Sequence, residues 1–352
     1  MLNIKRKKGD STLFSGKRIL VTGGTGSLGR AIVKRLLTGE MGRPNKIIVF
    51  SRDEGKHHQM KLDFKHRAVG TDDIFYNNFE ETLDFRVGDV RDYHAVLRVV
   101  QEANVVIHAA ALKQVPSCEY FPNEAVLTNV LGAQNIVSAI RQGMTKVTLA
   151  IAVSTDKACK PINVMGMTKA LQERIFVEAN LGSRSTIFAC VRYGNVVASR
   201  GSVVPLFAEQ IRVGGPITLT IPGMTRFLIT LDGAVNTVFD AARWAKAGDT
   251  FVPRLPSATV ETIAKAMIGS RTIKTKIIGI RPGEKIHEIM VSEDEAFRTQ
   301  SYRGYYVIRP TLPELRKQEA MEPTLHDEYS SEHSVVSLNE TRAILKSAGY
   351  AV

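Results

Sequence analysis

The sequence has few cysteines and no long apolar run. Its three cysteines, Cys118, Cys159 and Cys190, are widely spaced and form no Cys-x-x-Cys pair. This excludes zinc fingers and disulfide scaffolds, predicts no metal site and fits a reducing compartment. The longest apolar stretch, 147–153, is far too short to cross a bilayer. Because no charged and then apolar leader opens the chain, we expect a cytoplasmic protein without a membrane span.

Acidic residues are also scarce relative to basic ones. The 352 residues include 47 Lys and Arg against 35 Asp and Glu, a formal net charge of +12. This surplus favours a phosphate-bearing partner. Nucleic acid is not expected, because the basic residues are not interleaved with aromatic residues for base stacking. The one basic run, at 5–8, lies in a segment, 1–14, that we predict to be a mobile N-terminus.

From residue 17 onward, short β-branched runs alternate with helical periodicity. This alternation predicts an α/β fold, a Rossmann-type doubly wound parallel sheet. The predicted strands are 17–22, 46–50, 85–89, 105–108 and 146–154. The clearest predicted helices are 31–37 and 123–141.

Past residue 195, glycine and proline interrupt the pattern, which indicates a smaller C-terminal lobe that binds the substrate. Residue 337 is a serine suited to cap a helix over 338–348. The predicted division is a dinucleotide-binding domain at 15–198 completed by 226–256, a substrate lobe at 199–225 and 257–330, and a C-terminal helical segment at 331–352.

The first predicted strand runs into a glycine-rich turn that precedes a helix. Such glycines let the backbone approach a pyrophosphate, which then lies at the helix N-terminus. The strand-turn-helix context makes this a dinucleotide-binding signal rather than a merely tight turn. The residues of the turn are Gly23, Gly24, Thr25, Gly26, Ser27, Leu28 and Gly29.

The end of the second strand bears on the choice of cofactor. Ser51 and Arg52 suit a 2′-phosphate, because a guanidinium group binds phosphate through two hydrogen bonds. They therefore predict NADP. Asp53, which could accept from a 2′-hydroxyl, leaves NAD open, and a solvated loop arginine is the plainer interpretation of Arg52.

Two more strand ends are candidate cofactor contacts. Asp89, followed by Val90, is placed to reach an adenine edge, although a turn aspartate is the alternative. Ala109 and Ala110 follow the fourth strand, where small side chains allow close approach of a cofactor. His108 before them is better explained as a core histidine than as a catalyst.

The densest chemical signal follows the fifth strand. Thr155, Asp156 and Lys157 stand at its carboxyl end, where open α/β sheets bind ligands. An adjacent acid and amine can divide proton donation and acceptance if their environments move their pKa values apart. Met165 and Lys169 follow on one predicted helix, four residues apart and on the same face.

These features together resemble the extended short-chain dehydrogenases/reductases. More narrowly, the chain is similar to the nucleotide-sugar 4,6-dehydratases of polysaccharide biosynthesis, above all to those that act on UDP-N-acetylglucosamine and invert C-5. The resemblance covers roughly residues 15–330. Its motifs are AALKQVP at 110–116, VSTDKA at 153–158, RYGNV at 192–196 and GIRPGEK at 279–285.

The resemblance implies oxidation at C-4, loss of water across C-5 and C-6, and return of the hydride to C-6, with the cofactor as a temporary hydride store. Asp156 would protonate the departing C-6 hydroxyl, and Lys157 would remove H-5, for which it needs a lowered pKa. Lys169 would orient the nicotinamide ribose. The implied substrate contacts are Lys113, which also touches the cofactor, and Asn195, Val203, Arg226, Arg281 and Glu284. A homo-oligomer is also expected.

One position departs from the family pattern. The usual tyrosine, which takes the proton from O-4, is replaced by Met165, and a thioether cannot transfer a proton. Lys157, or Thr155 relaying to it, becomes the candidate acceptor, with the Tyr193 hydroxyl as an alternative. Two other functions stay open: a UDP-sugar C-4 epimerase, and an NADP-binding regulator without catalysis.

Overall fold

A computed structural model describes residues 12–70, 79–183, 185–197, 202–281, 283–316 and 322–350. The basic run at 5–8 lies outside these ranges. Within them, no helix combines the length and apolarity that crossing a bilayer requires.

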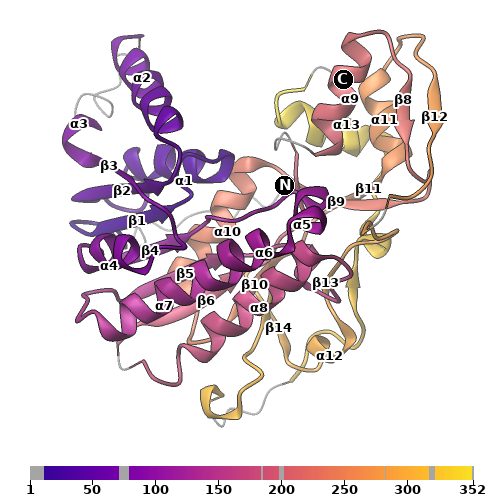
Figure 1. The fold of residues 1–352 in the computed structure, drawn as a ribbon. Helices are drawn as coiled ribbons and strands as arrows, with labels where there is room; N and C mark the ends of the chain where they lie inside the picture. Colours follow the sequence, from indigo (N-terminus) through magenta and orange to yellow (C-terminus); the bar gives the residue numbers. More distant parts are fainter. Residues whose placement is uncertain are drawn as a thin grey trace.

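A nine-stranded sheet forms the centre of the molecule, in the order β14-β15-β10-β6-β5-β4-β1-β2-β3 (Figure 1). Seven strands are parallel, and the order reverses between β1 and β4, as in doubly wound folds. The Rossmann-type prediction is confirmed. The parallel strands are β1 (Arg18–Thr22), β2 (Lys46–Ser51), β3 (Leu83–Val87), β4 (Val105–His108), β5 (Leu149–Val153), β6 (Ile187–Val191) and β10 (Thr250–Pro253).

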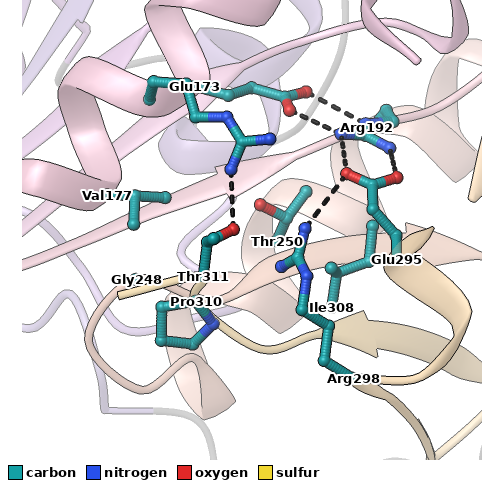
Figure 2. Close-up of a pocket in the computed structure, with 11 residues that line it drawn as sticks. Glu173, Val177, Arg192, Gly248, Thr250, Glu295, Arg298, Ile308, Pro310 and Thr311 are labelled. Atoms are coloured by element: carbon teal, nitrogen blue, oxygen red, sulfur yellow. Dashed lines mark hydrogen bonds and ion pairs between the residues drawn. The ribbon is translucent and has the colours of Figure 1, made fainter. Parts of the chain in front are cut away.

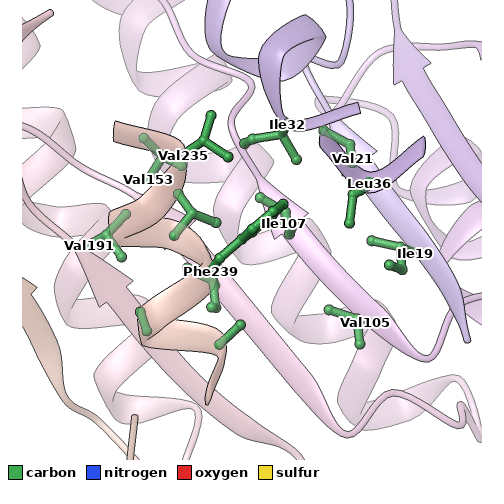
Figure 3. Close-up of a cluster of buried hydrophobic side chains, with 14 of the residues drawn as sticks. Ile19, Val21, Ile32, Leu36, Val105, Ile107, Val153, Val191, Val235 and Phe239 are labelled. Carbon is green, nitrogen blue, oxygen red and sulfur yellow. The ribbon is translucent and has the colours of Figure 1, made fainter. Parts of the chain in front are cut away.

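Helices cover both faces of this sheet because alternate strand residues point to opposite sides. On one face, Ile19 and Val21 of β1 pack against Ile32 of α1 and Phe239 of α10 (Figure 3). On the other face, Leu20 belongs to a second core. The first face carries α1 (Ser27–Leu37), α2 (Glu54–Gly70) and α10 (Leu231–Trp244), and the second carries α4 (Tyr93–Gln101), α7 (Gly132–Gln142) and α8 (Val164–Glu178).

The helix predicted at 123–141 is continuous but not uniform. It consists of α6 (Pro122–Ala125), a π-helical segment at Val126–Leu131, and α7. Asn129 in the π segment is buried, and its amide hydrogen-bonds both the N–H and the C=O of Leu112 and the hydroxyl of Thr168. This segment therefore fixes the loop that follows β4.

A smaller lobe stands apart from the sheet, at the upper right of Figure 1. Its core is apolar and includes Phe207, Ile263 and Leu345. Ser337 caps the last helix through a capping box, as predicted. The lobe contains α9 (Val203–Arg212), α11 (Val260–Ile268) and α13 (Leu338–Ser347), the parallel pair β8 (Ile217–Leu219) and β12 (Thr275–Ile277), and the sheet of β7 (Asn195–Val196), β9 (Thr225–Ile229) and β11 (Ser257–Thr259).

Short elements complete the described chain. These are α3 (Phe79–Thr82), α5 (Val115–Tyr120), α12 (Glu293–Ala296), β13 (Ile289–Val291), β14 (Thr299–Tyr302), β15 (Tyr305–Ile308), β16 (Tyr329–Ser330) and 3₁₀ turns at Asp156–Ala158, Pro313–Leu315 and Ser331–Ser334.

Two predicted boundaries were wrong. Strands β14 and β15 extend the large sheet, although the sequence analysis placed them in the substrate lobe. The hairpin between them turns at Arg303 and Gly304, both at positive φ (48° and 85°), and an Arg-Gly pair is a weak signal for such a turn. Phe14, predicted to lie in a mobile tail, is fully buried and packs edge-on against Phe239 at 5.6 Å.

Candidate active site

A cavity of about 950 Å³ lies between the carboxyl ends of the parallel strands and the smaller lobe. Every predicted site residue except the buried Asp156 lines it. From the sheet side these are Gly23, Thr25, Gly26, Ser27, Leu28, Gly29, Ser51, Arg52, Asp89, Val90, Ala109, Ala110, Lys113, Thr155, Lys157, Met165 and Lys169. From the lobe side they are Asn195, Val203, Arg226, Arg281 and Glu284.

The glycine turn has the shape of a pyrophosphate cradle. Gly23 has a φ of 64°, and a Cβ there would lie 2.7 Å from the backbone nitrogen of Ala110. A Cβ at Gly29 would lie 2.4 Å from the carbonyl oxygen of Gly23. Gly26 is the N-cap of α1, with no side chain to satisfy the first N–H groups of the helix. These groups are available to phosphate oxygens, so the residues present fit a dinucleotide.

The end of β2 is organised by hydrogen bonds between side chains. The Ser51 hydroxyl lies 2.9 Å from that of Thr25 and 2.7 Å from Nε2 of His57. Asp53 accepts from the Lys56 backbone at 3.0 Å and pairs with the Lys56 ammonium at 2.6 Å. The Asp53 carboxylate is therefore engaged at the start of α2, and both Arg52 and Asp53 line the cavity.

Asp89 and His108 have strong protein partners. Both oxygens of Asp89 accept hydrogen bonds from Arg91, at 2.7–3.0 Å. Burial alone would raise the pKa of Asp89, but these hydrogen bonds lower it. His108 hydrogen-bonds Thr22 at 2.8 Å and stacks on Phe176, and burial lowers its pKa to about 3. It is a neutral core histidine, as predicted.

Four side chains meet at the end of β5, and we call them the Lys157 cluster: Lys157, Asp156, Asn195 and Glu288. The Lys157 ammonium donates to Oδ1 of Asp156 at 3.1 Å and to Oδ1 of Asn195 at 3.2 Å. It also lies 3.0 Å from Oε1 of Glu288. Thr155 donates to the same Asp156 oxygen at 2.9 Å, and Thr155 lies between Asp156 and the cavity.

The cluster separates the pKa values of its two carboxyl groups. Burial raises the pKa of Asp156, and the nearby Glu288 charge adds to the rise. Burial has the same tendency at Glu288, but Lys157 and Arg226 outweigh it and lower the pKa. For Lys157, burial would lower the pKa, yet Asp156 and Glu288 raise it. The lowered pKa that sequence analysis required of Lys157 is therefore not found, because the two carboxylates outweigh burial.

Sequence analysis did not identify Glu288. Its side chain is 1% exposed, lines the cavity and lies 3.7 Å from Nε of Arg226. The available signal was a carboxylate followed directly by the apolar run 289–291, three residues beyond the GIRPGEK motif. An acidic residue before a buried strand needs a partner, and here the partner is the predicted catalytic lysine.

Arg226 and Asn195, two of the implied substrate contacts, lie in or close to the Lys157 cluster. Arg226 lies on the buried strand β9 and donates to the carbonyls of Thr225 and Ile286. Asn195 contacts the catalytic lysine. Arg281, in contrast, is exposed at the cavity, and Glu284 Oε2 is buried without a hydrogen-bond partner among the described residues.

The helix α8 presents Met165 and Lys169 to the cavity. Met165 packs with Cys118 and Ala125. The Lys169 ammonium donates to the carbonyl of Val153 at 2.5 Å and to Gln172 at 2.7 Å. Burial lowers the pKa of Lys169 to about 8.

Two hydroxyl groups also lie at the cavity. Tyr193 is buried, and burial raises the pKa of its phenol. Ser154, which sequence analysis did not select, has a buried hydroxyl without a hydrogen-bond partner among the described residues.

A second group of buried charges lies behind the cavity, and we call it the Arg192 cluster: Arg192, Glu173 and Glu295. Figure 2 shows the Arg192 guanidinium between the two carboxylates. It bonds both oxygens of Glu173 at 2.6 and 3.0 Å and both oxygens of Glu295 at 2.7 and 3.0 Å. It also donates to the carbonyl of Met290 in β13 at 2.8 Å. The cluster joins α8, β6 and the segment that carries Glu288.

Comparison with known proteins places this geometry in a family. A family model described as "Polysaccharide biosynthesis protein" matches residues 19–310. A UDP-N-acetylglucosamine 4,6-dehydratase (inverting) from Campylobacter jejuni is 42% identical over 304 residues, 85% of each chain. A protein named UDP-glucose 4-epimerase from Rickettsia bellii is 43% identical over 301 residues, 84% of each chain.

Solved structures agree with the sequence relatives. Pen from Bacillus thuringiensis has a TM-score of 0.84 and 32% identity, with 95% of this chain and 99% of that chain covered. The dTDP-glucose 4,6-dehydratase DesIV from Streptomyces venezuelae, solved with NAD, shares the fold at a TM-score of 0.63 and 19% identity, with 76% and 86% covered. The chain belongs to the polysaccharide biosynthesis protein family of short-chain dehydrogenase/reductase type, which includes nucleotide-sugar dehydratases and epimerases.

Proposed function

We propose that this protein is a UDP-N-acetylglucosamine 4,6-dehydratase that inverts C-5 and uses NADP. The observation that carries the proposal is the Lys157 cluster, which places a buried acid with a raised pKa beside a lysine at the cavity. The similar dehydratase from Campylobacter jejuni, whose name gives this substrate and an inverting reaction, supports the proposal.

Each reacting group then has a task. A bound nicotinamide cofactor would accept a hydride from C-4 of the sugar and later return it to C-6. Asp156, whose pKa is raised by burial, supplies the proton that leaves with O-6, and Thr155, which donates to its carboxyl group, lines the cavity. Lys157 removes H-5, which the C-4 ketone has acidified, while one of its own protons passes to Oδ1 of Asp156, 3.1 Å away, whose proton has left with O-6. Lys157 then returns a proton to the opposite face of C-5. Lys169 orients the nicotinamide ribose from α8.

The nucleotide end of the substrate needs cations and hydroxyl acceptors. Arg281 is exposed at the cavity and can pair with the diphosphate. Glu284 offers a ribose hydroxyl an oxygen, Oε2, that has no hydrogen-bond partner in the part of the chain that the structure describes. The loop that carries both is tied to the catalytic segment, because Asn163 donates to the carbonyl of Gly283 at 2.7 Å and Lys285 to that of Cys159 at 2.5 Å.

The C-4 epimerase is the second candidate, because relatives with 43% and 44% identity, against 42% for the dehydratase, are named UDP-glucose 4-epimerase. An epimerase needs hydride transfer at C-4 but no acid for a C-6 hydroxyl. The buried Asp156 beside Lys157 favours the dehydratase, and it also argues against a regulator without catalysis.

One experiment separates these functions: incubation with UDP-N-acetylglucosamine in deuterated water, followed by NMR of the product. The inverting dehydratase yields a C-6 methyl group, a C-4 keto group and deuterium at an inverted C-5. An epimerase yields the C-4 epimer without deuterium at C-5, and a regulator yields no product. Either of the last two results would overturn the proposal.

The choice of NADP rests on the end of β2. Arg52 and Asp53 both line the cavity, and the competing carboxylate of Asp53 is engaged by Lys56. Arg52→Asp should shift preference toward NAD, because a carboxylate repels a 2′-phosphate and accepts from a 2′-hydroxyl. Cofactor released on denaturation of the wild-type protein should be NADP(H). Release of NAD(H) alone would contradict this assignment.

A further inference from the structure

The hydrogen bonds around Lys157 leave its nitrogen unable to accept a proton. An ammonium group has three N–H donors and no lone pair. Lys157 has three acceptors within reach: Asp156 Oδ1 at 3.1 Å, Asn195 Oδ1 at 3.2 Å and Glu288 Oε1 at 3.0 Å. All three donors are used, so the geometry is that of a charged lysine.

Oxidation of C-4 nevertheless releases the proton of the C-4 hydroxyl. Met165 cannot take it, and the buried Tyr193 phenol stays protonated because burial raises its pKa. Thr155 already donates to Asp156. Lys157 can act as the acceptor only if one of its own protons moves to a neighbouring group.

Two carboxyl groups touch Lys157, and only one is suited to receive that proton. Asp156 must keep its own proton for the C-6 hydroxyl. Glu288 is nearly fully buried, faces the cavity and has an oxygen, Oε2, without a hydrogen-bond partner among the described residues. The charged groups around Glu288 are Lys157 and Asp156 from the turn after β5, Arg226 from β9, and Lys285 from its own segment. Besides Lys157, the cations Arg226 and Lys285 favour the ionised form of Glu288.

We propose that Glu288 stores the proton released when C-4 is oxidised. As the C-4 ketone forms, the O-4–H bond breaks and a new N–H bond forms on Lys157. A different N–H bond of Lys157 breaks, and its proton forms an O–H bond on Glu288 Oε1, while the hydride leaves C-4 for the cofactor. Glu288 acts through Lys157 and is a positioning residue. The inference rests on the hydride step of the proposed function, a step that the epimerase alternative shares.

The test uses Glu288→Gln, which keeps the shape of the side chain but cannot store the proton, and Glu288→Asp, which can. Holoenzyme is mixed with UDP-N-acetylglucosamine, and formation of reduced nicotinamide is followed in a single turnover across a pH series. Glu288→Gln should slow this step by about 10²-fold or more at neutral pH. Its rate should then rise about tenfold per pH unit, because Lys157 must lose a proton to solvent. Glu288→Asp should recover part of the rate and the wild-type pH profile.

The matched control is Glu332→Gln, an exposed glutamate whose loss changes net charge equally. It should leave rate and pH profile unchanged. A Glu288→Gln variant with the wild-type rate overturns the inference, and so does a loss that is equal at every pH, since that is the mark of misplacement alone. Activity retained by Glu288→Asp would show that the loss in Glu288→Gln does not come from misfolding of the site.

The two proposals fail in different ways. Wild-type protein that forms reduced cofactor but no dehydrated product would overturn the dehydratase proposal and leave the Glu288 test intact. Wild-type protein that makes the dehydrated product, with an unimpaired Glu288→Gln variant, would overturn the Glu288 inference alone. Wild-type protein that never reduces its cofactor with this sugar would overturn both.

Discussion

The Lys157 cluster and the Arg192 cluster both combine a cation with two buried carboxyl groups, but they differ in how many carboxylate oxygens are hydrogen-bonded. Each places one cation between two buried carboxyl groups, and each joins a strand end of the large sheet to the segment that contains β13. In the Arg192 cluster, all four carboxylate oxygens are bonded. In the Lys157 cluster, Asp156 Oδ2 and Glu288 Oε2 have no hydrogen-bond partner within the described ranges, and the cavity reaches the lysine.

This difference separates a structural role from a chemical one. A fully bonded ion group gains most of its possible interaction energy in the folded state and has nothing to offer a ligand. An incompletely bonded group pays for its burial in stability and is available for proton transfer. Asp156→Asn and Arg192→Met test that distinction directly. Lys169→Met and Met165→Leu test two further residues of the cavity wall, and their expected effects are smaller.

Asp156→Asn should lower dehydration by about 10²–10⁴-fold, because an amide cannot protonate the departing hydroxyl. Oxidation at C-4 should persist, visible as reduced nicotinamide that accumulates without 4-keto-6-deoxy product. Asp294→Asn, an exposed change on α12, serves as the control. Near-normal product formation by Asp156→Asn would remove this residue from its acid role.

Arg192→Met should destabilise the fold by about 3–5 kcal/mol, since the buried Glu173 and Glu295 would lose the guanidinium that bonds both, and Glu295 would keep only its 3.5 Å contact with Arg298. Urea unfolding measures the loss. Adding Glu173→Gln and Glu295→Gln to the same chain should recover part of it, because the uncompensated charges are then removed. Unchanged stability of the single variant would show that the cluster is not structural.

Lys169→Met should change how stability depends on pH. Burial gives the folded protein a Lys169 pKa of about 8, against 10.5 for an ordinary lysine. Between these values the unfolded chain binds more protons, so wild-type stability should rise by up to about 3 kcal/mol as pH increases from 8 to 10.5. The variant should lose that rise in urea unfolding of cofactor-free protein. Lys265→Met, on the exposed face of α11, should retain it.

Met165→Leu should have the smallest effect, because it conserves volume in an apolar contact and removes no proton acceptor. The turnover rate with UDP-N-acetylglucosamine should stay close to that of the wild type. A loss comparable with that of Asp156→Asn would assign Met165 a direct role in the chemistry.

Sequence patterns were sufficient for the sheet and for most of the cavity wall. Buried parallel strands read as continuous β-branched runs, so β1, β2 and β4 were predicted to within one residue. The glycine turn and the end of β5 lie next to those strands in the chain. Local order therefore determined their place at the carboxyl edge of the sheet.

What the sequence analysis missed depends on contacts between distant parts of the chain. Glu288 lies 131 positions after Lys157, and only folding brings the two side chains to 3.0 Å. Phe14 belongs to a polar segment in the sequence, and its burial depends on contact with Phe239, which is distant in the chain. The strand β9, which carries Arg226, was missed for a similar reason, because its place between β7 and β11 depends on pairing with segments that are distant in the sequence.

The π-helical segment at Val126–Leu131 changes the directions in which the side chains before and after it point. A π turn accommodates one residue more than an α turn, and one residue corresponds to about 100° of rotation about the axis. Asn129 can thus point to Leu112 at the cavity loop, while Ile136 and Ile140 of α7 still point into the core beneath the sheet. Deleting one residue from this segment would force a choice between those two directions. Relatives whose helix is regular throughout should accordingly show a one-residue gap here when their sequences are aligned with this one.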